Sequence, residues 1–124
     1  MILLHGFPET HRSWMLQIPA LVAAGYRVAS LDLRGYGRSE RPAGPYDLDT
    51  LASDVAALAD ELGSDRVRLV GHDWGGAITW HFAATRPWRL ERAVVLDCPH
   101  PAVLVRALFD SRCQIRRSWY IFFF

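Results

Sequence analysis

The chain has 124 residues and a mass of 14.1 kDa, enough for one small domain with one hydrophobic core but not for two. Hydrophobic residues make up 51% of it, charged residues 22%, and the formal net charge is +1, which excludes the basic excess of a nucleic-acid-binding protein. Its apolar runs are too short for a signal peptide or a membrane span, so we expect no nucleic-acid partner and no membrane contact. Cys98 and Cys113 lack C-x-x-C or metal-like spacing, so we expect free thiols, a cytoplasmic location and neither metal nor cofactor.

The first half of the chain alternates short apolar runs with helical patterns. Strands are predicted at residues 2–4 and 26–31, separated by a helical stretch that starts at Trp14, is interrupted at Pro19 and stops at Gly25. A polar, glycine-rich loop follows at residues 32–39. Residues 50–62 carry leucine and valine at helical spacing, which predicts a helix that Asp47 or Asp49 caps and Gly63 ends.

The second half continues the same alternation. We expect a strand at 66–70, a tight turn, a helix at 76–85 and a strand at 92–96. Strands that alternate with helices predict βαβ units, and hence an α/β fold with a parallel sheet covered by helices on both faces. After residues 99–101 the period changes, and apolar residues at 103, 104, 107 and 108 predict a helix that leaves the sheet.

The turn between the third strand and its helix reads Gly71-His72-Asp73-Trp74-Gly75-Gly76. Glycines on both sides of Asp73 allow strand and helix to approach closely, and such a turn pushes the central side chain outward. A carboxylate that attacks an acyl carbon gives only an anhydride, whereas attack on the saturated carbon of an epoxide or alkyl halide gives an ester that water can hydrolyse. Asp73 therefore predicts alkyl transfer, with a simple helix N-cap as the alternative role.

Three motifs resemble the α/β-hydrolase fold family, and specifically its epoxide hydrolase and dehalogenase branch. They are His5-Gly6-Phe7-Pro8, which is similar to the family's H-G-x-P loop, residues 32–39, similar to its D-L-R-G-Y-G-x-S loop, and residues 71–76, similar to its G-H-D-W-G-G elbow. Each follows a predicted strand. The resemblance implies a partial α/β-hydrolase core at residues 1–101 and the start of a helical cap domain at 102–124, without two N-terminal strands and the C-terminal part of the family fold.

An oxyanion hole is expected next to Asp73. When water attacks the ester, negative charge develops on the carboxyl oxygen of Asp73 and needs fixed N–H donors. The Trp74 N–H at the start of the helix is one, and the resemblance implies that the Phe7 N–H is the other. His5, Gly6, Pro8, Gly71, His72 and Gly75 would support these groups, although residues 5–8 could also form an ordinary strand-ending turn. Strand alternation directs His72 away from Asp73, which favours a structural role for it.

Two further site residues come from the resemblance. Asp97 closes the last predicted strand, where some dehalogenase-like members place the acid that orients the catalytic His; a cap or turn residue is the alternative. Tyr120, in Ser118-Trp119-Tyr120, matches a cap segment in which a Tyr hydroxyl hydrogen-bonds the oxirane oxygen, which suits the alkoxide that ring opening leaves. The alternative there is an aromatic helix face used for packing.

The resemblance favours a small-molecule epoxide as substrate, with a haloalkane as the alternative because Trp74 and Trp119 would suit halide binding. None of the five histidines lies in the late loop that holds the family's catalytic His (His5, His11, His72, His81 and His100). We therefore expect the isolated chain to be inactive or to alkylate once at Asp73 and stop. A different possibility is a catalytically inactive truncated product that self-associates through exposed sheet edges and its Phe-rich end.

Overall fold

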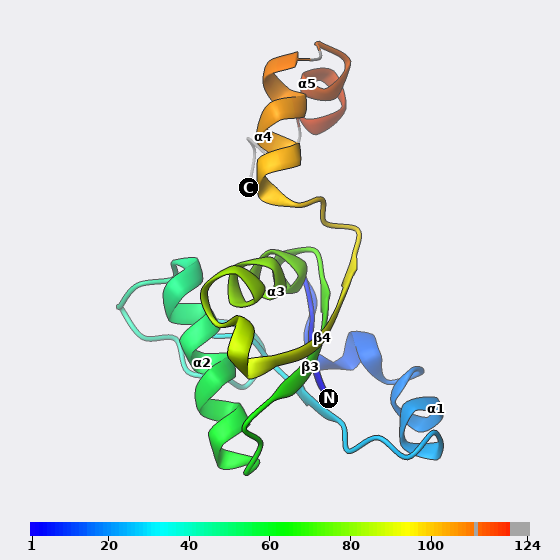
Figure 1. The fold of residues 1–124 in the computed structure, drawn as a ribbon. Helices are drawn as coiled ribbons and strands as arrows, with labels where there is room; N and C mark the ends of the chain where they lie inside the picture. Colours follow the sequence, from blue (N-terminus) through cyan, green and yellow to red (C-terminus); the bar gives the residue numbers. More distant parts are fainter. Residues whose placement is uncertain (111, 120–124) are drawn as a thin grey trace.

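A parallel sheet forms the centre of the computed structural model, which describes residues 1–110 and 112–119. Within these residues the sheet has four strands in the order β2-β1-β3-β4, all parallel (Figure 1). The strands are β1 (Ile2–Leu4), β2 (Ala29–Leu31), β3 (Val67–His72) and β4 (Leu90–Leu96). Parallel neighbours need crossover connections, which helices provide here. The predicted α/β fold with a parallel sheet is therefore confirmed.

Helices lie on both faces of the sheet. The helices α2 (Leu48–Glu61) and α3 (Trp74–Thr85) cover one face, and α1 (Ile18–Ala23) lies on the other side (Figure 1). The main hydrophobic core fills the space under α2 and α3, with Leu4 and Leu69 from the sheet packed against Val55, Ile78 and Phe82 from the helices. β1 is fully buried because β2 and β3 flank it on both edges.

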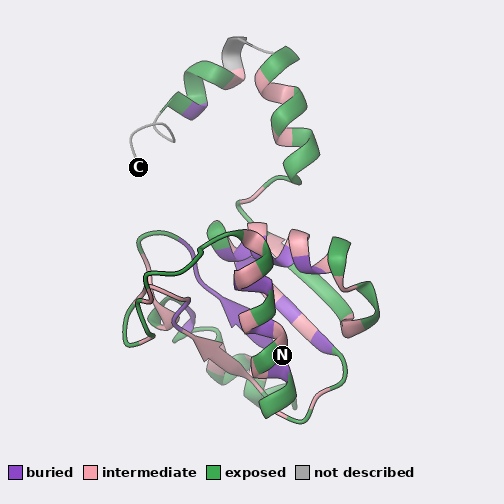
Figure 2. Cartoon of the chain, turned by 90° about the vertical axis from the view of Figure 1, so that its left-hand side faces the viewer, coloured by how far each residue is buried: buried purple, intermediate pink, exposed green. Residues whose placement is uncertain are grey.

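The opposite face of β3 and β4 is less covered. Residues of β3 alternate between buried and half-buried, as expected when helices cover one face and little covers the other. β4, the edge strand, is largely exposed (Figure 2). Its Val94 is 50% exposed and its Leu96 43%. An apolar strip on this part of the sheet thus faces the solvent.

Several element boundaries differ from the predicted ones. The helical stretch predicted from residue 14 to 24 is a 3-10 turn at His11–Trp14 followed by α1, because Pro19 lacks an N–H and fits only the first turn of a helix. Of the strand predicted at 26–31, only the residues of β2 pair with β1. β3 continues to His72, which pairs with Leu96, and α3 already begins at Trp74, so the turn is tighter than expected.

The helix α2 has the cap that the sequence suggested. Of the two candidate caps, Asp47 is the one used: its Oδ1 accepts a hydrogen bond from the Thr50 N–H at 2.9 Å. Gly63 follows the last turn with φ +64°, a conformation that favours glycine and ends the helix.

After β4 the chain leaves the sheet. The helices α4 (Pro101–Asp110) and α5 (Arg112–Ser118) stand away from the rest of the molecule as an arm (Figure 1), which confirms the predicted helix after residue 101. The Trp80 indole donates to the Cys98 carbonyl at 3.1 Å and fixes the base of this arm to α3. Across the described ranges, every helix is too short or too polar to cross a bilayer. The division into a core at 1–101 and a cap at 102–124 stays a prediction.

Candidate active site

The turn between β3 and α3 holds Asp73 in an unusual backbone conformation. Its φ is 51° and its ψ is −116°, a combination that is costly for any residue with a Cβ. The surrounding backbone holds it there: the Asp73 N–H donates to the Leu96 carbonyl at 3.2 Å, and the Asp73 carbonyl accepts from the Ala77 N–H at 3.0 Å. Although Asp73 occupies the N-cap position of α3, its side chain makes no capping hydrogen bond. The simple N-cap role is therefore wrong.

Glycines make this sharp turn possible. A Cβ on Gly71 would collide with the Gly75 carbonyl, and a Cβ on Gly75 would collide with the carbonyl of Leu4 in β1. A Cβ on Gly76 would come within 2.6 Å of the Cys98 Cβ. Only residues without a side chain let β3, α3 and β1 approach this closely.

The loop after β1 meets the turn directly. Because β1 and β3 are parallel neighbours, both end at the same edge of the sheet, and the Phe7 N–H donates to Asp73 Oδ1 at 2.8 Å. The Phe7–Pro8 peptide bond is cis. Gly6 lies so close that an added Cβ would be 2.5 Å from the Asp73 Cβ. Trp74 is the first residue of α3, where the N–H has no carbonyl partner within the helix. The structure thus brings Phe7, Asp73 and Trp74 together.

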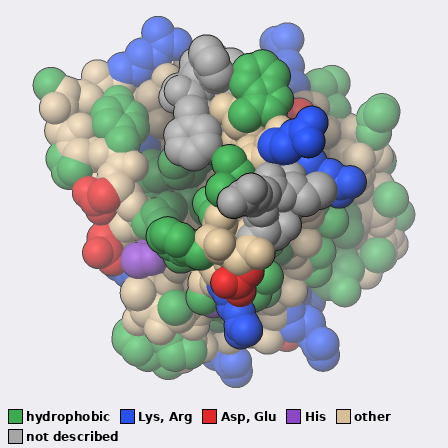
Figure 3. All heavy atoms as spheres, turned by 90° about the horizontal axis from the view of Figure 1, so that it is seen from above, with side chains coloured by type: hydrophobic (Ala, Val, Ile, Leu, Met, Phe, Trp, Pro, Cys, Tyr) green, Lys and Arg blue, Asp and Glu red, His purple; other side chains and the backbone are tan. Residues whose placement is uncertain are grey.

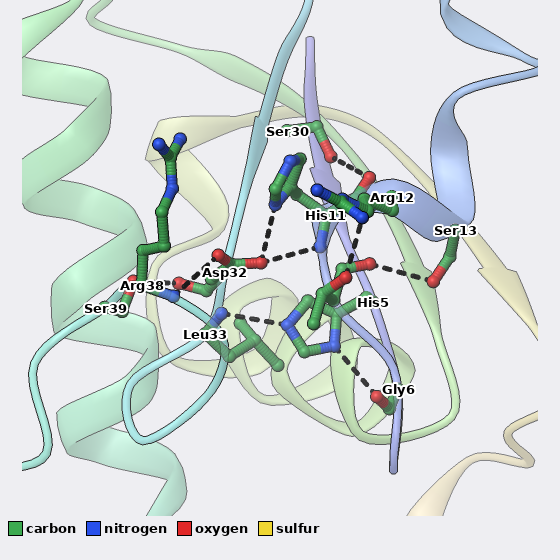
Figure 4. A network of polar contacts seen from close by, with 11 residues as sticks. His5, Gly6, His11, Arg12, Ser13, Ser30, Asp32, Leu33, Arg38 and Ser39 are labelled. Atoms are coloured by element: carbon green, nitrogen blue, oxygen red, sulfur yellow. Dashed lines mark hydrogen bonds and ion pairs between the residues drawn. The ribbon is translucent and has the colours of Figure 1, made fainter.

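Two predicted supporting residues occupy different surroundings. His5 is fully buried; its Nε2 accepts from the Leu33 N–H at 3.0 Å, and its Nδ1 lies 2.8 Å from the Gly6 carbonyl (Figure 4). His72 lies on the less covered face of β3, where its Nδ1 is 3.1 Å from Glu9 Oε2. The Glu9 contact suits the structural role that strand alternation predicts for His72.

Sequence reasoning missed the importance of Asp32. Burial by itself would raise the pKa of Asp32, but hydrogen bonds from the backbone N–H groups of Arg38 and His11 and from the His11 ring hold it well below its usual range. His11 Nδ1 lies 2.7 Å from Asp32 Oδ1 (Figure 4). A charged carboxylate thus ties the 32–39 loop to the segment that follows the H-G-F-P loop. The position of Asp32 at the start of the polar loop was the sequence feature that could have indicated this role.

Tyr36 was also not singled out from the sequence. Its ring stands edge-on to the His5 ring with the centroids 5.0 Å apart. Burial, and after it the negative charge of Asp73, raise the pKa of Tyr36. The phenol therefore remains protonated at neutral pH near the carboxylate.

The remaining predicted residues lie farther along the chain. Asp97 follows β4 with φ 51° and is exposed, at the same sheet edge as Asp73. Trp119 directly follows α5 and is 59% exposed. Tyr120 lies outside the described residues, so its predicted role stays a prediction.

Two hollows lie away from the turn. One of about 260 Å³ lies near Met1, Arg27 and Arg68, and another of about 220 Å³ is lined by Asp32, Arg34 and Asp54. Asp73 lines neither of them and is half-buried at an open sheet edge. Seen from above, the molecule carries hydrophobic side chains over much of the face on the arm's side (Figure 3).

A comparison with known families decides the relationship. The profile of the alpha/beta hydrolase fold family matches residues 1–114. The chain belongs to this family. Its curated relatives include the AB hydrolase superfamily protein YfhM of Bacillus subtilis, 44% identical over the whole chain and 44% of its own length, and Epoxide hydrolase 4 of Mus musculus, 42% identical over the whole chain and 35% of its own length.

Solved structures support the epoxide hydrolase branch of this α/β-hydrolase family. An epoxide hydrolase from Bacillus megaterium, solved with its naphthyloxy-propanediol product, has a TM-score of 0.93 and 35% identity, covering 99% of this chain and 44% of its own. An epoxide hydrolase from hot-environment metagenomes has a TM-score of 0.88 and 42% identity, covering 97% of this chain and 41% of its own. The chain spans less than half the length of these relatives.

Proposed function

We propose that this chain carries the nucleophile of an epoxide hydrolase, and that the nucleophile is Asp73. The supporting observation is the 2.8 Å hydrogen bond from the Phe7 N–H to Asp73 Oδ1, at a turn whose strained backbone directs this carboxylate toward a neighbouring loop instead of its own helix. Strain that the surrounding backbone maintains is typical of residues with a chemical role. A small-molecule epoxide is the substrate class that a carboxylate nucleophile suits.

In the first step, Asp73 Oδ2 attacks a carbon of the oxirane ring. A new C–O bond forms, the ring C–O bond breaks, and its electron pair leaves on the oxirane oxygen. The Phe7 N–H holds Oδ1 and so orients the other oxygen toward the substrate. The resulting alkoxide needs a proton, which the family resemblance assigns to the hydroxyl of Tyr120. The product of this step is a neutral ester between Asp73 and the substrate.

In the second step, water gives a proton to a base and attacks the ester carbonyl; the acyl C–O bond to the substrate then breaks, the substrate oxygen takes up the proton, and the diol and the Asp73 carboxylate are released. Negative charge then develops on the carboxyl oxygen that faces Phe7, and the N–H groups of Phe7 and Trp74 stabilise it. This step needs a base. The histidines of this chain are engaged elsewhere: their rings contact Leu33, Asp32, Glu9, Asp49 and Trp80. We therefore propose that these 124 residues form the ester once and hydrolyse it slowly. Asp97 stays a candidate for the acid that orients a histidine.

One observation keeps a haloalkane as the alternative substrate. The Trp74 side chain is 50% exposed directly beside Asp73, where its indole N–H could bind a departing halide. The nucleophile and the ester would be the same. For either substrate we place the reaction in the cytoplasm, because the sequence holds only two cysteines, without C-x-x-C spacing, which suits a reducing compartment.

The test is to incubate the chain separately with styrene oxide and with a bromoalkane, and to follow intact mass, diol and bromide. We expect a mass increase of one styrene oxide per chain, with little diol. The Asp73→Asn variant should gain no mass. Asp110→Asn, which changes an exposed carboxylate on the arm, should react like the wild type. Labelling by the bromoalkane with bromide release, but not by the epoxide, would favour the alternative; no labelling by either reagent would refute the nucleophile.

A further inference from the structure

His5 occupies a buried position between two loops. Its ring is fully buried, directly after β1, and connects the 32–39 loop to the peptide that precedes Phe7 (Figure 4). Its backbone carbonyl also accepts the Gly75 N–H of α3 at 3.1 Å. One residue therefore contacts all three motifs that carry the family resemblance.

The two partners of the ring require a single tautomer. The Leu33 N–H, 3.0 Å from Nε2, is a donor, so Nε2 accepts and carries no proton. The Gly6 carbonyl, 2.8 Å from Nδ1, is an acceptor, so Nδ1 carries the proton. A doubly protonated ring would place an N–H against the Leu33 N–H in a buried site, which is unfavourable. The two contacts thus fit the tautomer of His5 that carries its proton on Nδ1.

The Gly6 carbonyl and the Phe7 N–H belong to the same planar peptide unit. Because the unit is rigid, a bond that fixes the direction of the carbonyl also fixes the direction of the N–H. The Gly6 carbonyl accepts two bonds, one from His5 Nδ1 at 2.8 Å and one from the Glu9 N–H at 2.9 Å. On its other side, the Phe7 N–H points to Asp73 Oδ1 at 2.8 Å.

We propose that His5 is a positioning residue for the oxyanion hole: its Nδ1–H holds the Gly6 carbonyl and so aims the Phe7 N–H at the Asp73 carboxylate. The inference rests on the proposed role of Asp73 as nucleophile for its effect on the reaction, but its effect on the Phe7 amide is independent of that role. The Leu33 bond and the edge-on Tyr36 ring hold the imidazole in place.

Two amide variants separate positioning from packing. The side-chain nitrogen of Asn lies about where Nδ1 of His lies, so His5→Asn keeps a donor for the Gly6 carbonyl and leaves the Leu33 N–H without its acceptor. His5→Gln reaches instead to the place of Nε2 and loses the bond to Gly6. His11→Gln is the matched control, because the His11 ring belongs to the same network but contacts Asp32. Folding of each variant is checked by circular dichroism.

The readouts are the amide spectrum of Phe7 and the rate of ester formation with styrene oxide. We expect His5→Gln to shift the Phe7 amide resonance, speed its hydrogen exchange and slow ester formation about tenfold. His5→Asn should keep both near the wild type, while the Leu33 amide exchanges faster. The control should leave Phe7 unchanged. Equal effects of Asn and Gln, or an unchanged Phe7 amide in His5→Gln, would overturn the positioning role.

Two further results separate the role of His5 from the proposed function and from a failure of the variants to fold. If the Phe7 amide responds as expected but the wild-type chain forms no ester, the proposed function fails and the role of His5 stands. If the His5 variants do not fold, the ring nitrogens of the wild-type protein decide: nitrogen shifts that show the proton on Nδ1 support the inference, and a proton on Nε2 overturns it.

Discussion

The Asp73 carboxylate meets an amide that lies 66 residues away in the chain, and both partners depend on small neighbours. The positive φ of Asp73 persists because Leu96 and Ala77 hold its backbone on both sides. Gly6 then brings the loop close enough for the Phe7 N–H to reach the carboxylate. The geometry of the candidate site therefore depends on small distances between these residues, which single substitutions can change.

Gly6→Ala is expected to displace the loop from the carboxylate. The new Cβ would lie 2.5 Å from the Asp73 Cβ, closer than packed carbon atoms come, so loop and turn must separate. We predict that ester formation with styrene oxide slows by about a hundredfold, because a small misplacement of a reacting group has effects of this size. Gly44→Ala, at a glycine with open space around it, should keep the wild-type rate. Equal rates for the two variants would contradict this geometry.

Asp32 is expected to make the fold sensitive to acid. Its hydrogen bonds from Arg38 and His11 hold the folded-state pKa well below the usual range, so the stabilisation is present above the unfolded-state pKa of about 4 and is lost as the pH falls. Asp32→Asn should therefore lose less of its free energy of unfolding than the wild type between about pH 5 and pH 2. Urea titrations at several pH values measure this loss. The expectation fails if Asp32→Asn is as acid-sensitive as the Asp110→Asn control.

At the scale of elements, the helix α2 depends on its first turn. The Asp47 side chain accepts from the Thr50 N–H, which otherwise has no partner in the helix. Asp47→Ala should lower the melting temperature by about 5 °C, because loss of a cap has an effect of this order in a domain of this size. Asp47→Asn keeps an acceptor and should recover most of the difference in a thermal melt. An alanine variant that melts with the wild type would show that this cap contributes little.

The order and type of the main elements could be predicted because each leaves a local pattern. An apolar run predicts β1, and apolar residues at helical spacing predict α2. The glycines of the β3–α3 turn predict the turn. The boundaries were less predictable. β3 extends to His72 because β4 offers a partner up to Leu96, and pairing with a distant strand leaves no mark in the local sequence.

The candidate site divides in the same way. Asp73, Phe7 and Trp74 could be identified from motifs, since each lies within a few residues of a glycine or a strand end. The contact of Asp32 with His11 and the edge-on contact of Tyr36 with His5 could not, because they join segments about 20 to 30 residues apart. Burial and direction of a side chain depend on the assembled sheet, and only the structure supplies them.

For the molecule as a whole, the open part of the sheet is the main feature. Among the described residues, β4 is an edge strand of the sheet and is largely exposed (Figure 2). Its apolar residues Val94 and Leu96 are 50% and 43% exposed. The chain spans 44% of the length of YfhM and 35% of the length of Epoxide hydrolase 4. YfhM is therefore more than twice as long as the chain, and Epoxide hydrolase 4 is nearly three times as long. Self-association through this edge remains a prediction.

We expect the chain to self-associate as its concentration rises. Val94→Lys should reduce this association, because a charge on an edge strand opposes pairing with another chain. Val103→Lys is the matched control: Val103 is 61% exposed, but it lies on α4, away from the sheet edge. Sedimentation velocity at several protein concentrations measures the association of the wild type and of both variants. A wild-type monomer throughout, or equal effects of both substitutions, would contradict association through β4.

The most direct measurement of the central claim is the position of the covalent bond. The wild-type chain is incubated with styrene oxide, digested, and its peptides are sequenced by tandem mass spectrometry. We predict a single modified residue, Asp73, with no adduct at the exposed carboxylate of Asp97. An adduct spread over several surface carboxylates, or one that persists unchanged in Asp73→Asn, would contradict the assignment of Asp73 as the nucleophile.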